Sequence, residues 1–288
     1  MPKKVLVTGA AGSLGSQALQ ALIAHGFAVV AAVRRDVDEL PAGAESVRFD
    51  FDDAKTFGPA LSGVNLLFLI APPLDPSSPR RLNPVIDAAK DANIEFVVFN
   101  SAIGINHNEH SPLRQVERHL MNSGLPYTIL RPNFFMENFS KGHTASEIAQ
   151  GGIYLAAGDA KTSFISAADI AEAVAVAFER AENKAEYDLT GPEALDHAEV
   201  AKIVTEATGR PVTYHAIEES AMIDGARQMG LPEPNLQYLA GLYGAVRNGF
   251  ASPVKDDFHR LTGKQPMTFR EFAETNSGAW ASTSAGRV

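Results

Sequence analysis

Short apolar runs alternate with amphipathic stretches along the first half of the chain. Between the runs, apolar residues recur at helical spacing in 16–23, 79–92 and 111–123. The runs themselves end in turn residues and predict strands at 4–8, 28–33, 47–49, 66–70, 96–99 and 127–130. Continuous apolar strands between helices are typical of a parallel sheet that helices cover on both faces. The pattern therefore predicts an α/β, doubly wound fold, which binds ligands at the carboxyl ends of its strands.

The pattern changes after Pro132, where predicted strands become scarce. Helical spacing dominates the rest of the chain, in residues 166–180, 197–208, 218–229 and 235–248. We therefore predict a first domain over 1–150 and a smaller, mostly helical region on the substrate side over 151–288, which can return strands or helices to the first. Residues 275–288 are small and polar and predict a loose tail.

A glycine triplet follows the first predicted strand at once. Gly9 permits a tight turn, Gly12 lets the backbone approach a pyrophosphate, and Gly15 lets the next helix pack against the strand. Ser13 and Leu14 belong to the same loop, where free N–H groups and the helix dipole face an anion. The loop predicts a dinucleotide-binding βαβ unit, and with it the Rossmann type of doubly wound sheet.

The second predicted strand ends in Arg34 and Arg35. In a βαβ unit this position faces the ribose of the adenosine. The guanidinium groups of arginine match a 2′-phosphate, whereas an acid would accept a hydrogen bond from the 2′-hydroxyl of NAD. The two arginines favour NADP(H) over NAD(H). Asp36 also lies about 20 residues beyond the glycines and is the alternative, an acid of the NAD type.

Composition agrees with an enzyme of ordinary size. The chain has 288 residues, 45% of them hydrophobic, and can bury a large core. Its net charge of -9 argues against a nucleic-acid surface. It has no cysteine, which excludes disulfides and thiolate sites and fits the cytoplasm. No apolar run approaches the roughly 20 residues that span a bilayer, and no signal peptide is expected. We expect a small-molecule substrate, no nucleic-acid or membrane partner, and either a monomer or a homodimer.

Five motifs spread along the chain carry a family resemblance. They are residues 7–15 (VTGAAGSLG), 33–35 (VRR), 123–132 (SGLPYTILRP), 133–138 (NFFMEN) and 189–193 (LTGPE). Together they resemble the NmrA-like, atypical branch of the short-chain dehydrogenase/reductases. This group holds NADPH-dependent quinone and azo-dye reductases as well as redox-sensing regulators, and the resemblance covers nearly the whole chain.

The resemblance implies a set of cofactor and substrate contacts. It implies that the glycine loop and Arg34 bind the phosphates of NADP, and that Phe134 and Phe135 wall the nicotinamide and substrate cleft. It places two residues near the adenine, Asp50 and Phe51. It places five residues beside the ribose and nicotinamide, namely Ala71, Pro72, Pro73, Asn100 and Ser101.

The proton relay of the wider superfamily is absent. That relay is a tyrosine four residues before a lysine, and none of the six tyrosines has a lysine at that distance. In the expected place stand His110 and Arg114, whose spacing could put an acid and a cation on one helical face. Pro112 opposes a helix that begins so early. The catalytic residue is therefore unknown, with His110 and Arg114 as weak candidates.

The histidines of this loop and the charged residues of the following helix also have purely structural interpretations. His107 and His110 can belong to a solvated loop, and we expect no metal site there because nothing distant completes the ligand set. Three residues, Arg114, Glu117 and Arg118, most simply form an exposed helix face.

The segment after the sixth predicted strand is open to two interpretations. Residues 133–136 can be core, although aromatic residues directly beyond a strand also suit a flat ligand. Arg131 can equally be structural.

The leading hypothesis is an NADPH-dependent oxidoreductase. A hydride can pass from NADPH to a quinone or other conjugated acceptor whose oxygens take protons from water, so a missing relay does not exclude the reaction. Phe134, Phe135 and Met136 would help to form the acceptor's pocket. The alternatives are a non-catalytic NADP(H)-sensing regulator of the NmrA type and a tailoring enzyme on the same scaffold.

Overall fold

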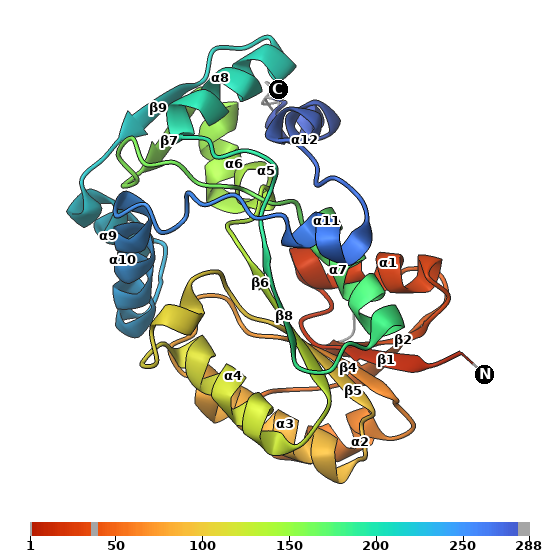
Figure 1. The fold of residues 1–288 in the computed structure, drawn as a ribbon. Coiled ribbons are helices and arrows are strands. Elements are labelled where there is room, and N and C mark those ends of the chain that lie inside the picture. The colour runs from red at the N-terminus through yellow and green to blue at the C-terminus, as the bar shows by residue number, and fades with distance from the viewer. Residues whose placement is uncertain (1, 36–39, 282–288) are drawn as a thin grey trace, which may run out of the picture. The chain divides into compact units, whose positions relative to one another are not determined.

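The computed structural model describes residues 2–35 and 40–281, which form two units (Figure 1). The first unit comprises Met1–Pro132, Ala167–Leu189 and Asp256–Lys264. The second comprises Asn133–Ser166, Thr190–Lys255 and Gln265–Val288. The first unit thus ends at Pro132, before the boundary near residue 150 that the sequence suggested. The first unit also includes two later segments, Ala167–Leu189 and Asp256–Lys264, because they pair with its sheet and pack on its helices.

The first unit contains a sheet of seven parallel strands in the order β3-β2-β1-β4-β5-β6-β8. The strands are β1 (Lys4–Val7), β2 (Ala28–Val33), β3 (Ala44–Arg48), β4 (Leu66–Ile70), β5 (Phe96–Asn100), β6 (Tyr127–Pro132) and β8 (Ala185–Leu189). Chain order reverses at β1 and β4, where Val5 lies beside Leu66 and Val7 beside Phe68. This arrangement confirms the predicted doubly wound α/β fold. The β1/β4 junction is the kind of switch point at which such sheets bind ligands.

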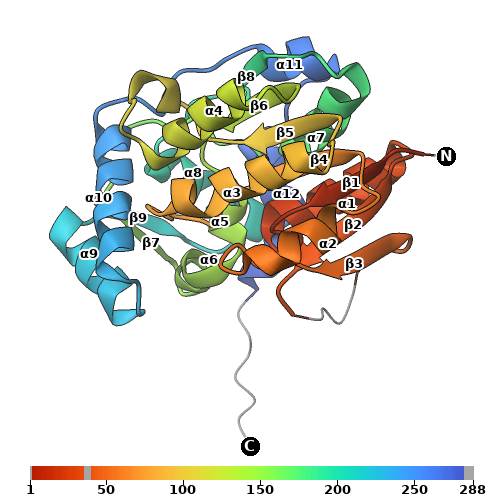
Figure 2. The same cartoon turned by 90° about the horizontal axis from the view of Figure 1, so that it is seen from below.

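Helices cover both faces of this sheet (Figures 1 and 2). Helix α1 packs against α7 on one face, and α3 packs against α2 and α4 on the other. Helix α11 packs against α7 and β8. The bounds are α1 (Ser13–Ala24), α2 (Phe57–Leu61), α3 (Ser78–Asp91), α4 (Pro112–Ser123), α7 (Ala167–Arg180) and α11 (Asp257–Thr262), with 3₁₀ turns at Ala54–Thr56 and Ile105–His107.

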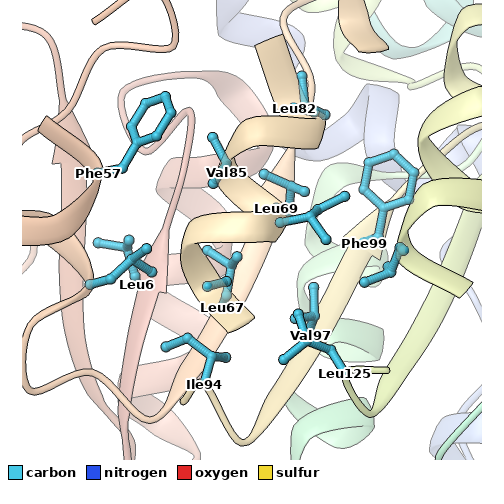
Figure 3. Packing of buried hydrophobic residues seen from close by; sticks show 14 of the residues in the cluster. Leu6, Phe57, Leu67, Leu69, Leu82, Val85, Ile94, Val97, Phe99 and Leu125 are labelled. Carbon is cyan, nitrogen blue, oxygen red and sulfur yellow. The ribbon is translucent and has the colours of Figure 1, made fainter. Parts of the chain in front are cut away.

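The main core of the first unit lies between the sheet and α3 (Figure 3). Leu67 and Leu69 from β4, Phe99 from β5 and Val85 from α3 are completely buried. Truncating one such leucine to alanine costs about 2–5 kcal/mol of stability, because neighbours fill the cavity only in part. The core therefore holds the carboxyl ends of β1, β4 and β5 in fixed positions.

The second unit is mostly helical, as predicted. Its two strands pair in parallel, with Gly152 opposite Thr213, and a capping box of Asp196 and Glu199 begins α8. Its elements are α5 (Glu137–Ser140), α6 (Gly142–Ala149), β7 (Gly152–Leu155), α8 (His197–Thr208), β9 (Thr213–Ala216), α9 (Glu219–Gln228), α10 (Glu233–Arg247), α12 (Phe269–Thr275) and a 3₁₀ turn at Ser277–Trp280.

The expectation of a loose tail from residue 275 needs correction for its first part. Trp280 is completely buried, and its Nε1 donates a hydrogen bond to the Phe139 carbonyl at 2.7 Å. A large aromatic side chain with a satisfied polar atom anchors the chain to the second unit. Residues 282–288 lie outside the described part. Within residues 2–35 and 40–281, none of the helices has the length and apolar character to cross a membrane.

Candidate functional site

The glycine loop at the end of β1 has a geometry that favours glycine at three positions and excludes a side chain at Gly15. Gly9 has φ +61°, in the left-handed region. A Cβ added to Gly15 would lie 2.2 Å from the Gly9 carbonyl oxygen, and one added to Gly12 would lie 3.2 Å from the same atom. The Gly12 N–H donates to that oxygen at 2.9 Å and closes the turn. The close approach of strand and helix predicted for the triplet is therefore present.

The first turn of α1 has no side-chain cap. Gly12 stands at the N-cap and has no side chain to accept from the N–H groups that follow. Ser13 is half-buried and Leu14 is buried in the unit. The N–H groups of this first turn and the positive end of the helix dipole are the features on which anions bind at helix starts.

A threonine joins the glycine loop to the neighbouring strand end. The Thr8 hydroxyl accepts from the Ile70 N–H at 2.7 Å and donates to the Ile70 carbonyl at 3.1 Å. A Cβ on Gly9 would lie 3.6 Å from Ile70. The next residues along the chain, Ala71, Pro72 and Pro73, thus begin beside the glycine loop.

Two arginines follow β2 directly. Arg34 and Arg35 are both exposed, and neither forms a hydrogen bond or ion pair with another described residue. The charge of Arg34 nevertheless reaches Asp52: the pKa of this carboxyl is lowered, chiefly by hydrogen bonds from Arg81 and also by the charges of Arg80 and Arg34. Asp36, the alternative acid of the NAD type, lies outside the described residues.

The end of β3 places Asp50 and Phe51 side by side. The Asp50 carboxylate accepts from the Asp52 N–H at 3.0 Å, which fixes the turn after the strand. Phe51 is half-buried and meets Phe49 edge to face, with ring centroids 5.0 Å apart. Asp50 is half-buried as well. Both residues lie at the same sheet edge as the glycine loop, because all strands of this sheet are parallel.

Asn100, the last residue of β5, carries an unsatisfied polar atom. The residue is 9% exposed, and its Oδ1 is buried without a hydrogen-bond partner among the described residues. An orphaned acceptor of this kind is costly unless a ligand or water pairs with it. The neighbouring Ser101 differs, because its hydroxyl donates to the Glu117 carboxylate at 2.6 Å.

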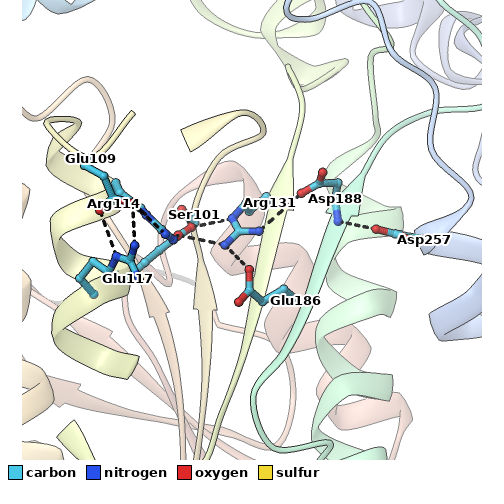
Figure 4. A network of polar contacts seen from close by, with 9 residues as sticks. Ser101, Glu109, Arg114, Glu117, Arg131, Glu186, Asp188 and Asp257 are labelled. Carbon is cyan, nitrogen blue, oxygen red and sulfur yellow. Dashed lines mark hydrogen bonds and ion pairs between the residues drawn. The ribbon is translucent and has the colours of Figure 1, made fainter. Parts of the chain in front are cut away.

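Glu117 is the centre of a buried ionic network below this strand end (Figure 4). It is completely buried and accepts from Arg131 Nε at 2.8 Å and from Arg114 Nη1 at 2.7 Å. Burial raises the pKa of the Glu117 carboxyl, but hydrogen bonds from Arg131 and Ser101 outweigh it, so the pKa lies below its usual value. Arg131 also pairs with Glu186 at 2.5 Å. Arg131 thus has a structural role.

The exposed helix face predicted for Arg114, Glu117 and Arg118 is wrong for its first two members. Arg114 and Glu117 are buried on α4, and only Arg118 is exposed. The Glu109 carboxylate accepts from both arginines, at 3.1 Å from Arg114 and 2.7 Å from Arg118, which lowers its pKa to about 2. Two carboxylates compensate the charge of Arg114, which offsets the cost of burying its guanidinium group.

The structure does not bring His110 and Arg114 onto one helical face. Helix α4 begins at Pro112, so His110 precedes it in an exposed turn. His107 is exposed as well, at the end of a 3₁₀ turn. In the described ranges no three histidine, aspartate or glutamate side chains come together in a way that could hold a metal ion.

The predicted substrate residues fall in the second unit and differ in their surroundings. Met136 is completely buried and belongs to the core of this unit rather than to the wall of a pocket. Phe135 is half-buried and pairs with Ile165 in a parallel bridge. Phe134 lines a small hollow that is partly open to solvent. The hollow is lined by Phe134, Asn138, Phe139, Thr144, Leu155, Phe164, His197 and Tyr243.

Sequence reasoning placed Glu117 on an exposed face and did not single out His197. Both continue the apolar stripe of their helix: Glu117 falls between Val116 and Leu120, and His197 lies three and seven residues before Val200 and Val204. A polar residue at a stripe position was a signal for a buried polar group.

A glycine loop without a side-chain cap at the β1/β4 switch point of a parallel sheet, with an orphaned acceptor at the end of the next strand, β5, places the first unit in the class of Rossmann-type dinucleotide-binding folds. The profile of the NmrA-like family matches residues 1–273, and the chain belongs to this family.

Three similar proteins extend this assignment. An uncharacterized oxidoreductase (YesF) of Bacillus subtilis is 35% identical over 282 residues, which are 96% of each chain. The NAD(P)H azoreductase of Xenophilus azovorans is 32% identical over 287 residues, 96% of this chain and 99% of the relative. An NADPH-dependent quinone oxidoreductase of Escherichia coli, solved in complex with NADPH, has a TM-score of 0.80 at 26% identity and covers 94% of this chain and 99% of its own.

Proposed function

We propose that this protein is an NAD(P)H-dependent oxidoreductase that transfers a hydride from NADPH to a flat, conjugated small molecule such as a quinone. The observation that carries the proposal is the fit of the glycine loop and Asn100 to a dinucleotide: close packing at Gly15, an uncapped helix start at Gly12 and an orphaned buried Oδ1. An azoreductase and a quinone oxidoreductase among the similar proteins support the reaction class.

Different residues of the first unit would contact different parts of the cofactor. The N–H groups of Ser13, Leu14 and Gly15 would bind the pyrophosphate at the start of α1. At the other strand ends, Asp50 and Phe51 would lie near the adenine, and 71–73 beside the ribose. The Asn100 Oδ1 would accept a hydrogen bond from the cofactor that the protein itself does not supply. When bound, NADPH supplies the hydride.

The preference for NADPH would come from the end of β2. Arg34 and Arg35 are exposed cations without an ion pair among the described residues, so their guanidinium groups are free to bind a 2′-phosphate. The nearby Asp52 is engaged by Arg81, with Nη2 to Oδ2 at 2.8 Å. Arg81 thereby keeps a carboxylate from neutralising the phosphate-binding arginines.

We assign the protons of the reaction to water. Arg114 is held by Glu109 and Glu117, and the Ser101 hydroxyl donates to Glu117. Neither side chain is therefore free to give a proton to an acceptor. A reduced quinone is a stable anion that water can protonate, so the chain needs to supply only binding and orientation.

The decisive experiment is a titration of the purified protein with NADPH and NADH, followed by nucleotide fluorescence. A quinone, 2-methyl-1,4-naphthoquinone, is then added and the absorbance decay at the nicotinamide band is recorded against a protein-free control. The absence of cysteine helps, because no thiolate can form an adduct with the quinone. Tight NADPH binding with catalytic turnover supports the proposal. If the protein binds NADPH tightly but turns over no quinone, azo dye or enone, the proposal is overturned.

The second candidate is a non-catalytic NADP(H) sensor. The observation that favours it is the commitment of Arg114 and Ser101 to Glu117, which leaves no proton relay at the position where the superfamily has one. A sensor would bind NADP and NADPH with different affinities and change a protein partner with them. Equal affinities together with turnover would exclude this candidate.

A further inference from the structure

The small sheet of the second unit has an open edge at β9 (Figure 1). This strand pairs with β7, and the Thr213 N–H donates to the Gly151 carbonyl at 2.9 Å. In a parallel ladder every second residue bonds to the same neighbour, so the backbone groups of Tyr214 and Ala216 point away from β7. Within residues 2–35 and 40–281 these N–H and C=O groups have no hydrogen-bond partner.

The other sheet edges of the described ranges are charged or covered. At one edge of the large sheet, β3 carries two charged side chains. At its other edge, the Asp188 N–H of β8 donates to the Asp257 carboxylate of α11 at 2.8 Å. The outer edge of β7 packs against α6, where the Glu147 carboxylate accepts from the Tyr154 N–H. Charge and cover are the usual protections of an edge, because an open edge pairs with another chain.

Strand β9 lacks both protections. Its sequence, TYHA, contains no acidic residue, lysine, arginine or proline, and Thr213, His215 and Ala216 are exposed. A row of accessible, unpaired backbone groups without a charged side chain is a template for an additional strand.

Opposite charges flank this strand. Arg210 precedes it and Glu218 follows it, each four residues from Tyr214. Arg210 is half-buried and Glu218 is exposed, and neither side chain forms an ion pair or hydrogen bond with another described residue. In a symmetric dimer the same surface meets itself, so it must be self-complementary. A strand with a cation before it and an anion after it is complementary to its own antiparallel copy.

We propose that β9 pairs with β9 of a second copy of this chain, antiparallel about a two-fold axis at Tyr214. The inference goes beyond the proposed function, because it concerns assembly and uses only residues of the second unit. In this register each Arg210 lies opposite Glu218 of the partner subunit. The ion pair therefore forms at both ends of the shared strand pair, and the small sheet continues from one copy into the other.

The register also satisfies the open backbone groups. Tyr214 lies opposite Tyr214 of the partner subunit, and such a pair exchanges both of its hydrogen bonds. Ala216 lies opposite Val212 of the partner subunit. The Val212 carbonyl accepts from the Thr205 hydroxyl at 3.3 Å and has a second lone pair for the Ala216 N–H. An interface built on one short strand belongs to the weak, concentration-dependent class.

The first test is sedimentation velocity of the full chain at about 1 to 500 µM, where a weak dimer should form progressively. Arg210→Glu should raise the dissociation constant at least about tenfold, because repulsion replaces attraction at both ends. Glu218→Arg should do the same, and the double variant Arg210→Glu/Glu218→Arg should restore association. The matched control is Lys202→Glu, which reverses an exposed cation on α8 and should associate like the wild type.

Cross-linking tests the register itself, because the chain has no cysteine of its own. The proposed pairing places Thr213 opposite His215 of the partner subunit, with Cα atoms about 4.5 Å apart, which a disulfide can bridge. Both residues are exposed. The double variant Thr213→Cys/His215→Cys should form a disulfide-linked dimer on mild oxidation. Either single variant should not, because two copies of the same position lie roughly 8 Å apart.

Three results would each overturn the inference. The first is a chain that stays monomeric up to about 500 µM, which would leave the edge to a different partner. The second is association that neither charge reversal weakens. The third is cross-linking of the single cysteine variants that equals that of the double variant.

Discussion

Arg131 and Glu117 form a two-point ion pair inside the first unit, with Nε to Oε1 at 2.8 Å and Nη2 to Oε2 at 3.0 Å. Both side chains are almost completely excluded from solvent, at 3% and 0% exposure. The pair connects β6 to α4 directly below the end of β5. It therefore supports the strand end that carries Asn100, while taking no part in the proposed chemistry.

Glu117→Gln should destabilise the protein strongly. The amide keeps the shape of the side chain but leaves Arg131 and Arg114 without the charge that compensates their burial, which should lower the free energy of unfolding by about 3 kcal/mol. The matched control is Glu109→Gln, which removes the other partner of Arg114 but lies more than half-exposed, at 54%. Urea unfolding monitored by circular dichroism measures both. A loss for Glu117→Gln no larger than that of the control would contradict a central role for this carboxylate.

His25 should make the contact of α1 with α7 dependent on pH. Its imidazole lies 2.8 Å from the Glu179 carboxylate and 3.3 Å from that of Glu172. Burial alone would lower the pKa of His25, but hydrogen bonds and charges from the two glutamates outweigh it and raise the pKa. A raised pKa means that the stabilisation is fully present below the ordinary value of 6.5 and is lost as the pH rises through the folded-state value.

The matching experiment is urea unfolding of His25→Gln and wild type at pH 6 and pH 9. The variant should be the less stable at pH 6, by less than about 1 kcal/mol because solvent screens such pairs, and the two should converge at pH 9. His110→Gln removes an exposed histidine without an ion pair among the described residues and serves as the control. If the difference in unfolding free energy between wild type and His25→Gln grows towards pH 9, the glutamates do not stabilise a charged His25.

Gly15→Ala should weaken nucleotide binding. The new Cβ would lie 2.2 Å from the Gly9 carbonyl oxygen and 2.7 Å from the Ala10 Cα, so the loop must move away from the start of α1. We expect NADPH affinity to fall at least about tenfold, the loss of one or two charge-assisted hydrogen bonds. Gly58→Ala, on α2 with nothing within 4 Å of the added atom, should bind NADPH like the wild type. Unchanged affinity in Gly15→Ala would remove the glycine loop from the proposed site.

Arg34→Ala should reduce the affinity for NADPH about 10- to 100-fold, as expected for a charged pair with phosphate, and leave the affinity for NADH nearly unchanged. Fluorescence titrations with both nucleotides at two salt concentrations measure the effect, since screening should weaken NADPH binding more. Arg35→Ala tells which of the two arginines binds the phosphate. Equal losses for both nucleotides in both variants would favour the alternative acid, Asp36.

The sequence predicted the sheet and the glycine loop because both depend on local patterns. Apolar runs and the spacing of Gly9, Gly12 and Gly15 determine strand, turn and helix over a few residues. It did not predict the burial of Arg114, because that depends on Glu117 in the same helix together with Arg131 from β6, a contact across 14 residues. Leu113, Val116 and Leu120 form an apolar stripe on this helix, and Glu117 falls within the stripe. Its position would have predicted a buried side chain if its charge had been disregarded.

The candidate site shows the same division. Phe134 could be chosen from the sequence because an aromatic residue after a strand is a local signal. His197 could not be paired with Phe134 and Tyr243, because the hollow draws its wall from α5, α6, α8 and α10, whose packing no short motif encodes. Met136, chosen with Phe134, lies completely buried. Residues close in sequence can thus differ in burial, one lining a hollow and the other lying in the core, and this difference depends on tertiary packing.

The path of the chain through the two units has a consequence for how the protein is made. The chain passes from one unit to the other after Pro132, Ser166, Leu189, Lys255 and Lys264. During synthesis, β6 emerges long before β8, its neighbour in the sheet, and presents an unpaired edge until residue 189 has left the ribosome. Nascent chains that stall within this interval are the ones most exposed to aggregation, and neither unit can be produced as a single uninterrupted fragment.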